Sequence, residues 1–178
     1  LPEHLGGSEG ETHIDNGALS FIIGATGIKS MVDVGCGPGG MVELARSKGL
    51  DAYGIDGDFT IPRTIPWHLH DFTTGHVDLG RTFDLCWCVE FVEHVEEQYA
   101  DNFIKVFQQC KYLMMTHAFP GQGGHHHVNE QPTQYWIDKL GEAGFIFEEE
   151  MTKHIRREST MKQKYIRTHG LFFKNGRI

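Results

Sequence analysis

The chain has 178 residues, a length typical of one domain and sufficient to bury a core without disulfide bonds. Apolar residues make up 39% of it, and no apolar run approaches the length of a membrane span. The formal net charge of −8 argues against sequence-independent binding to nucleic acid, which depends on Lys and Arg contacts to phosphates. Basic residues cluster only near the C-terminus, where a solvated helix face is the simpler interpretation: Lys153, Arg156, Arg157, Lys162, Lys164 and Arg167.

Four cysteines occur, and none forms a C-x-x-C pair: Cys36, Cys86, Cys88 and Cys110. Three lie in or beside apolar segments, so we expect buried free thiols and a reducing compartment. The first residues contain neither a basic region nor an apolar region of the kind found in secretory signals. We therefore expect a cytoplasmic protein.

Residues 1–16 are polar and Gly-rich and predict a flexible arm, followed by one domain over residues 17–178. In that domain apolar runs alternate with helical patterns, which is typical of an α/β sheet with helices on both faces. Strands are predicted at 30–34, 51–56, 67–71, 83–89, 111–117, 145–148 and 171–174. Helices are predicted at 17–27, 41–48, 133–143 and 152–168, and residues 90–110 are predicted to be mostly helical, as one helix or two. Pro62 and Pro66 leave little room for a helix between the second and third strands.

A Gly-rich turn at residues 33–39 joins the strand at 30–34 to the following helix. Glycines there allow a ligand to approach the backbone, and the helix N–H groups point toward it. Because Gly35, Gly37 and Gly39 are each two residues apart, the G-x-G-x-x-G spacing of nicotinamide enzymes is not cleanly met. Asp33 precedes the glycines, and its carboxylate suits the ammonium of a bound amino acid better than a diphosphate. A purely structural turn remains the alternative.

Two further aspartates end neighbouring predicted strands. Asp56 ends the strand at 51–56, where a carboxylate can accept hydrogen bonds from both ribose hydroxyls. Asp71 ends the next strand, where it can accept from an adenine amino group while Phe72 supports the ring. Each aspartate alone is more typical of a strand end or a helix cap. Three at successive strand ends indicate a nucleoside site.

In these residues the chain resembles the class I S-adenosylmethionine (SAM)-dependent methyltransferases, over roughly residues 28–148. Residues 32–39 match their first motif, and residues 83–90 match their fourth strand, whose end lies near the methionine part of the cofactor. The resemblance implies a seven-stranded, mostly parallel Rossmann-like sheet with an antiparallel last strand. It also implies a SAM site made by Asp33, Gly35, Cys36, Gly37, Gly39, Asp56, Gly57, Asp71, Phe72 and Cys88.

A second motif follows the fourth predicted strand. On a helix, Glu90, Glu93 and His94 would share one face, where they could bind a divalent cation or act as acid and base. Acidic residues at a helix N-terminus are also stabilised by the helix dipole alone. The pattern resembles ubiquinone-pathway O-methyltransferases and small-RNA terminal 2′-O-methyltransferases, in which such residues can hold a metal. Metal-free relatives share the pattern, so both alternatives stay open.

The loop at residues 116–129 carries three adjacent histidines, His125, His126 and His127. Because ligands of open α/β sheets bind beyond the carboxyl ends of the strands, these imidazoles are candidate acid–base groups; solvated imidazoles on a surface loop are the alternative. Part of the loop also resembles small stand-alone methyltransferases of phage genomes and bacterial surface-sugar gene clusters.

The sequence therefore predicts O-methylation of a small, sugar-like acceptor by SAM. Glu90, Glu93 and His94 would position or deprotonate the acceptor, and one of residues 125–127 would close the site. A metal-assisted RNA 2′-O-methyltransferase is one alternative, although the acidic charge counts against it. The other is a non-catalytic, cofactor-binding subunit that activates a protein partner.

Overall fold

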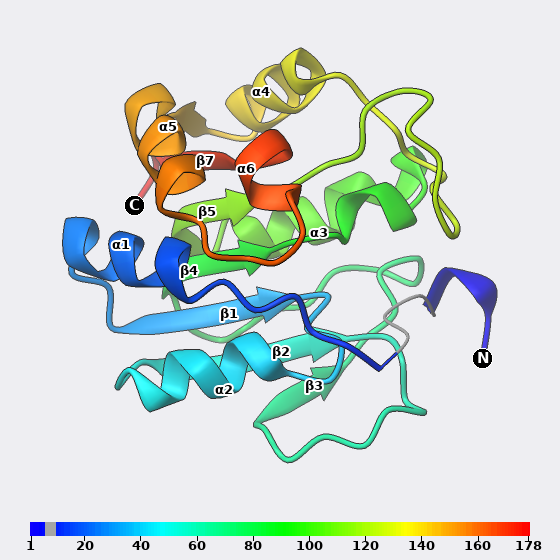
Figure 1. Cartoon of the computed structure of the whole chain (residues 1–178). Coiled ribbons are helices and arrows are strands. Elements are labelled where there is room, and N and C mark those ends of the chain that lie inside the picture. The colour runs from blue at the N-terminus through cyan, green and yellow to red at the C-terminus, as the bar shows by residue number, and fades with distance from the viewer. Residues whose placement is uncertain (6–9) are drawn as a thin grey trace.

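A computed structural model describes residues 1–5 and 10–178 (Figure 1). A single seven-stranded sheet runs through it, in the order β3-β2-β1-β4-β5-β7-β6. β7 is antiparallel to both of its neighbours, and the other described pairings are parallel. The strands are β1 (Ser30–Val34), β2 (Asp51–Asp56), β3 (Trp67–Leu69), β4 (Phe83–Cys88), β5 (Cys110–Met115), β6 (Phe145–Phe147) and β7 (Leu171–Asn175). The predicted fold class is confirmed.

Helices cover both faces of the sheet (Figure 1). The α-helices are α1 (Asn16–Thr26), α2 (Gly40–Ser47), α3 (Ala100–Phe107), α4 (Thr133–Glu142), α5 (Glu149–Glu158) and α6 (Tyr165–His169). Short 3-10 helices are η1 (Glu3–Leu5), η2 (Val92–His94) and η3 (Glu97–Tyr99). One core cluster joins the sheet to α3 and α4 through Phe103 and Trp136, and the other joins it to α1, α2, α5 and α6. Both faces of the central strands are thus buried, and every residue of β1 is buried.

The sequence analysis places every strand within two residues of its observed bounds. The largest differences are at the predicted ends Asp71 and His117, which lie two residues past β3 and β5. As predicted, no helix forms between β2 and β3, where Pro62 and Pro66 interrupt the chain. All four cysteines are free and buried, as expected. No helix in the described part of the chain combines the length and apolarity that crossing a bilayer requires.

The helical prediction for residues 90–110 is wrong over its first half, which holds the short 3-10 helices η2 and η3, whereas α3 lies in its second half. Glu90 has a φ of 54°, a left-handed conformation that an α-helix cannot contain, and only the single turn η2 follows it. Val92 and Val95 are both buried and lie three residues apart in the sequence. A 3-10 turn places residues at this spacing on one face as well as an α-helix does. Glu90 is therefore not on a helix face with Glu93 and His94.

The predicted helix over 152–168 is divided into α5 and α6. The interruption follows from Asp15, a fully buried carboxylate that caps α1 by accepting from the Ala18 amide at 2.9 Å. The same carboxylate accepts from the Ser159 hydroxyl and from the Thr160 amide. Residues 159 and 160 depart from helical geometry where they donate to the Asp15 carboxylate. These hydrogen bonds connect the start of α1 to the end of α5, and the two helices are in contact.

Candidate functional site

A cavity of about 350 Å³ opens at the carboxyl ends of β1, β2 and β4. This volume suits one small-molecule ligand, and the edge is the one at which open α/β sheets bind ligands. The Gly-rich turn after β1 forms one wall. Gly35 adopts a φ of 76°, and a Cβ there would lie 2.6 Å from the Phe91 ring, so only glycine fits. The Gly-rich turn thus packs closely against the Phe91 ring, and its backbone lines the cavity.

Asp33 lies in β1 and lines the cavity with only 3% of its surface exposed. Burial, and then the charge of Asp56, raise the pKa of the Asp33 carboxyl to about 8. Within the described residues no group donates a hydrogen bond to its side chain, so the ionised form of the carboxyl has no compensation from the protein. A ligand ammonium would supply that compensation.

Asp56 ends β2 and accepts three donors from the protein itself. Its Oδ2 accepts from the Gly37 amide at 2.7 Å, and its Oδ1 accepts from the Asp58 amide at 2.7 Å. The Arg63 guanidinium lies 2.9 Å from Oδ1. Burial raises the pKa of Asp56, while these amides and Arg63 oppose the shift and favour the ionised form.

Arg63 was missed by the sequence analysis. Its side chain is fully buried, stacks on Trp67 and donates to the carbonyl oxygens of Gly37 and Asp58. It thereby fastens the Gly-rich turn to the segment that replaces a crossover helix. An arginine in a Pro-containing loop offers no sequence signal for this role, because the contact depends on the loop's folded path.

Asp71 and Phe72 line the same cavity. The Asp71 Oδ1 accepts from the amide and hydroxyl of Thr73, and its Oδ2 lies 3.0 Å from His4 Nε2. Partial burial raises the pKa of Asp71, but the hydrogen bonds from His4 and Thr73 outweigh this and lower it overall. Phe72 is buried and meets Phe91 edge-on.

The N-terminal segment, expected to be a flexible arm, contributes to this cavity in its described part. His4, Leu5, Glu11, Thr12 and His13 line it. Figure 1 shows the N-terminal turn beside the carboxyl ends of β2 and β3. The segment's polar composition gave no indication of these contacts, which join residues far apart in the chain.

Most of the expected cofactor-site residues come together, but two do not. Cys36, Gly37 and Gly57 line the cavity with the three aspartates and Gly35. Gly39 packs against Ile65, and Cys88 is fully buried in the core. Cys88 turns toward the other face because side chains alternate along β4, so this segment reaches the cavity through Trp87, Val89 and Glu90 instead.

Glu90 lines the cavity in its strained, left-handed conformation. The Thr116 hydroxyl at the end of β5 lies 2.8 Å from the Glu90 amide and donates to its Oε1 at 3.2 Å. Burial raises the pKa of Glu90 to about 7, against the lowering effect of this hydrogen bond. Such strain and such a pKa are common at catalytic positions.

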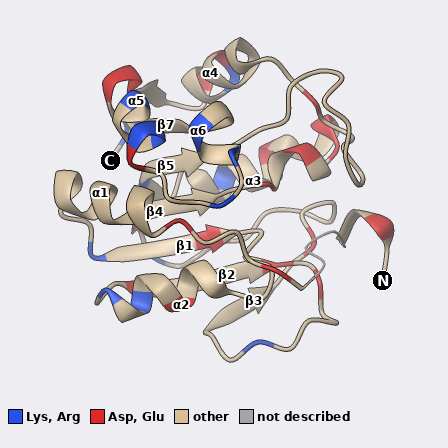
Figure 2. Ribbon diagram, viewed as in Figure 1, with Lys and Arg blue, Asp and Glu red and all other residues tan. Residues whose placement is uncertain are grey.

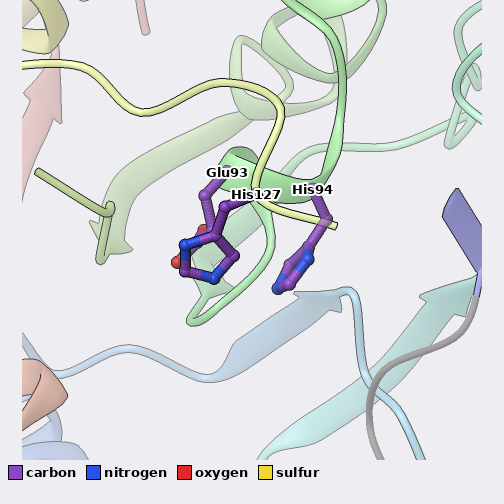
Figure 3. A group of neighbouring side chains, drawn as sticks. All are labelled: Glu93, His94 and His127. Atoms are coloured by element: carbon purple, nitrogen blue, oxygen red, sulfur yellow. The ribbon is translucent and has the colours of Figure 1, made fainter. Parts of the chain in front are cut away.

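Glu93, His94 and His127 form a compact cluster (Figure 3). Their ligand atoms all lie within 4.8 Å of one another. Neither carboxylate oxygen of Glu93 has a hydrogen-bond partner of good geometry in the described structure, and His94 Nδ1 is likewise buried and unpaired. Burial and the charge of Glu90 raise the pKa of Glu93, while burial and His127 lower that of His94 to about 4.

One carboxylate and two imidazoles are a donor set that suits Zn²⁺ and other first-row divalent metals. A buried carboxylate with both oxygens unpaired is costly in a protein interior, and a cation would compensate it. The residues present therefore fit a metal. The cluster differs from the expected set, since His127 belongs to it and Glu90 does not.

Of the other loop histidines, His125 lines the cavity, whereas His126 adopts a φ of 48° with its ring near His4. Tyr165, at the start of α6, also lines the cavity and meets His13 edge-on at 5.0 Å between ring centroids. Burial, and then Glu90 and Glu93, raise the pKa of Tyr165. The sequence analysis missed Tyr165, which lies in a helical pattern without a motif.

Acidic residues dominate the charge of the cavity. No Lys or Arg lines the cavity among the residues that the structure describes. Six acidic residues line it: Glu11, Asp33, Asp56, Asp58, Asp71 and Glu90. Figure 2 shows acidic segments along the carboxyl edge of the sheet, and basic ones mainly on α2, α5 and α6. Neutral or cationic ligands are favoured in such a field.

No protein-family model and no curated protein matches the chain. Solved structures match its fold. The methyltransferase domain of bacterial CtHen1-C is 17% identical, with 90% of this chain and 96% of that one covered and a TM-score of 0.62. The sugar N-methyltransferase KedS8 from Streptoalloteichus sp ATCC 53650 is 15% identical, with 94% and 89% covered and a TM-score of 0.67.

A third similar structure is magnesium protoporphyrin IX methyltransferase from Synechocystis PCC 6803 with bound SAM. It is 16% identical, with 87% of this chain and 74% of that one covered, and the TM-score is 0.58. At these identities the likeness establishes the fold. The chain has the class I, Rossmann-like methyltransferase fold, as its motifs predict.

Proposed function

We propose that this chain is a SAM-dependent methyltransferase that methylates a hydroxyl group of a small polar acceptor, with a divalent cation at Glu93, His94 and His127. The observation that carries the proposal is the unpaired, fully buried Glu93 carboxylate beside two histidines, at the ligand edge of a methyltransferase fold. When bound, SAM supplies an electrophilic methyl group, and the cation lowers the pKa of a hydroxyl that it binds.

The cofactor half of the cavity is supported by its three aspartates. Asp33 pairs with the SAM ammonium, and Asp56 accepts from the ribose, for which one lone pair of Oδ2 remains beside the Gly37 amide. Asp71 and Phe72 receive the adenine. Gly35 and Gly37 expose backbone to the methionine part of the cofactor.

The acceptor half lies between Glu90 and the metal cluster. Glu90, with a pKa of about 7, accepts the proton of the acceptor hydroxyl at neutral pH. Thr116 holds its carboxylate from β5. His125 and Tyr165 close the cavity and exclude water from the reacting atoms.

A neutral, sugar-like acceptor agrees with the charge of the cavity. Of the six acidic side chains that line the cavity, Asp33 is mostly protonated at pH 7, and those that are ionised would repel the phosphates of a nucleic acid. A polyol lacks charge and offers several hydroxyls to acidic acceptors. Methylation of RNA ends is therefore the competing outcome to methylation of a polyol in a substrate screen.

The metal site is tested by calorimetry on chelator-treated protein saturated with S-adenosylhomocysteine (SAH). Mg²⁺, Mn²⁺ and Zn²⁺ are titrated into wild type, Glu93→Gln and the exposed control Glu142→Gln. We expect one site in wild type and the control, with binding at least 10-fold weaker in Glu93→Gln. Absence of a saturable site in wild type would remove the metal from the proposal.

The acceptor class is tested by measuring SAH release from SAM with sugars, catechols and short RNAs, with and without chelator. We expect turnover with a polyol, its loss on chelation, and a decrease of at least 100-fold in Glu90→Gln. Turnover with RNA alone would overturn the proposed acceptor class while keeping the reaction.

A further inference from the structure

The loop at residues 118–131 is folded around one carboxylate. The Gly121 amide donates to Glu130 Oε2 at 2.7 Å, and the Gly123 amide donates to Oε1 at 2.6 Å. Both glycines adopt positive φ angles, 81° and 68°, which direct these amides inward. Glu130 therefore closes a compact turn in the loop that carries the three histidines.

The same loop is anchored to the turn that carries Glu93. The amides of Val128 and Asn129 both donate to the Glu93 carbonyl, at 2.9 and 3.1 Å. At its base, the Gln131 amide donates to the Ala118 carbonyl at 3.1 Å. The position of the loop relative to η2 is thus fixed by backbone contacts that do not involve a histidine side chain.

His127 is oriented by the third contact of Glu130. Its Nδ1 lies 3.3 Å from Glu130 Oε1, and both side chains are largely buried, with 9% and 18% exposed. An ionised carboxylate accepts only, so Nδ1 is the nitrogen that donates in this contact, and in the neutral ring Nε2 keeps its lone pair. The His127 ring meets that of His94 edge-on, 5.0 Å between centroids.

We propose that Glu130 is a positioning residue that fixes the tautomer and orientation of His127 so that its Nε2 serves as a metal ligand beside Glu93 and His94. The inference rests on the proposed function. Metal-bound histidines usually donate their other N–H to a carboxylate or carbonyl, and loss of that partner costs about 10- to 100-fold in metal affinity.

The first test is a thermodynamic cycle in metal affinity. Mn²⁺ and Zn²⁺ are titrated into SAH-saturated wild type, Glu130→Ala, His127→Ala and the double variant, with Glu142→Gln as a surface control. We expect Glu130→Ala to bind about 10- to 100-fold more weakly, and to have no further effect when His127 is already replaced. Unchanged affinity in Glu130→Ala, or full additivity in the double variant, would overturn the proposal.

The second test needs no metal. Long-range ¹⁵N–¹H spectra of the imidazoles report which nitrogen of His127 carries the proton. We expect the Nδ1–H form in wild type, retention in Glu130→Gln, whose amide oxygen still accepts, and a mixture in Glu130→Ala. The same spectrum in wild type and Glu130→Ala would refute the positioning role. If wild type binds no metal but the tautomer changes, the metal site fails while Glu130 still orients His127.

Discussion

At Asp33 the requirements of stability and of ligand binding differ. Its carboxyl is buried in β1, and burial raises its pKa to about 8. The folded protein therefore holds the proton more tightly than the unfolded chain does. The resulting stabilisation is complete below the unfolded value of 3.8 and is lost as the pH rises through about 8.

The substitution Asp33→Asn should remove this loss of stability with rising pH, because an amide stays neutral at every pH. We expect the ligand-free variant to be more stable than wild type above pH 4, with the difference growing by up to about 1.4 kcal/mol per pH unit until about pH 8. Urea denaturation at pH 5, 7 and 8.5 measures this. A variant less stable than wild type at all three values would show that Asp33 has a structural partner.

Binding of SAH is linked to the same proton. At pH 7 Asp33 is mostly protonated in the free protein, and the SAH ammonium stabilises its ionised form. We expect SAH binding to release protons at pH 7 and to strengthen up to about 10-fold per unit as the pH rises toward 8. Calorimetry in buffers of different ionisation enthalpy measures the release, and Asp33→Asn should abolish it.

At the scale of single residues, the sequence predicts those side chains whose place follows from a strand end. Asp33, Asp56 and Asp71 reach the cavity because successive parallel strands end at one edge. Arg63 and Tyr165 could not be found in this way. Their positions depend on a loop path and on a helix break, neither of which has a local pattern.

At the scale of elements, the strands are predictable because buried parallel strands are continuous apolar runs. The short turns are less predictable from sequence, because the apolar spacing at η2 fits a 3-10 turn as well as the predicted helix. The division between α5 and α6 depends on Asp15, more than 140 residues earlier in the chain. Contacts between residues so far apart in the chain cannot be recognised from a short stretch of sequence.

Asp15→Ala should therefore destabilise the protein strongly. It removes the cap of α1 and leaves the Ser159 hydroxyl and the Thr160 amide without their buried acceptor. We expect a loss of about 2–4 kcal/mol in the free energy of unfolding. Urea denaturation beside the exposed control Asp138→Ala checks this, and equal stabilities would refute the role of Asp15 in joining α1 to α5.

The N-terminal segment is the element whose role differs most from its composition. His4 contacts Asp71, and a Cβ on Gly57 would meet the Leu5 side chain at 2.4 Å. We expect His4→Ala with Leu5→Ala to weaken SAH binding severalfold and leave the unfolding free energy nearly unchanged, because η1 has no buried residue. The exposed Leu1→Ala is the control. Unchanged SAH affinity would show that the segment does not close on the cofactor.

At the scale of the whole molecule, the acidic cavity, the strained Glu90 and the cluster of Glu93, His94 and His127 lie at one edge of the sheet. The fold class follows from the alternation of apolar runs and helical patterns, and the likeness to solved methyltransferases confirms it. Glu93 and His94 were expected in the cluster from adjacency in sequence. The place of His127 in it, ahead of His125 and His126, was not, because the path of this loop and the contact of His127 with Glu130 have no local sequence pattern.

The most direct test is calorimetric titration of SAH into wild type, Asp33→Asn and the exposed control Asp138→Asn at pH 8. The account predicts a single saturable site in wild type and the control, and binding at least 10-fold weaker in a folded Asp33→Asn. Failure of wild type to bind SAH, or equal affinity in Asp33→Asn, would contradict the assignment of this cavity to SAM.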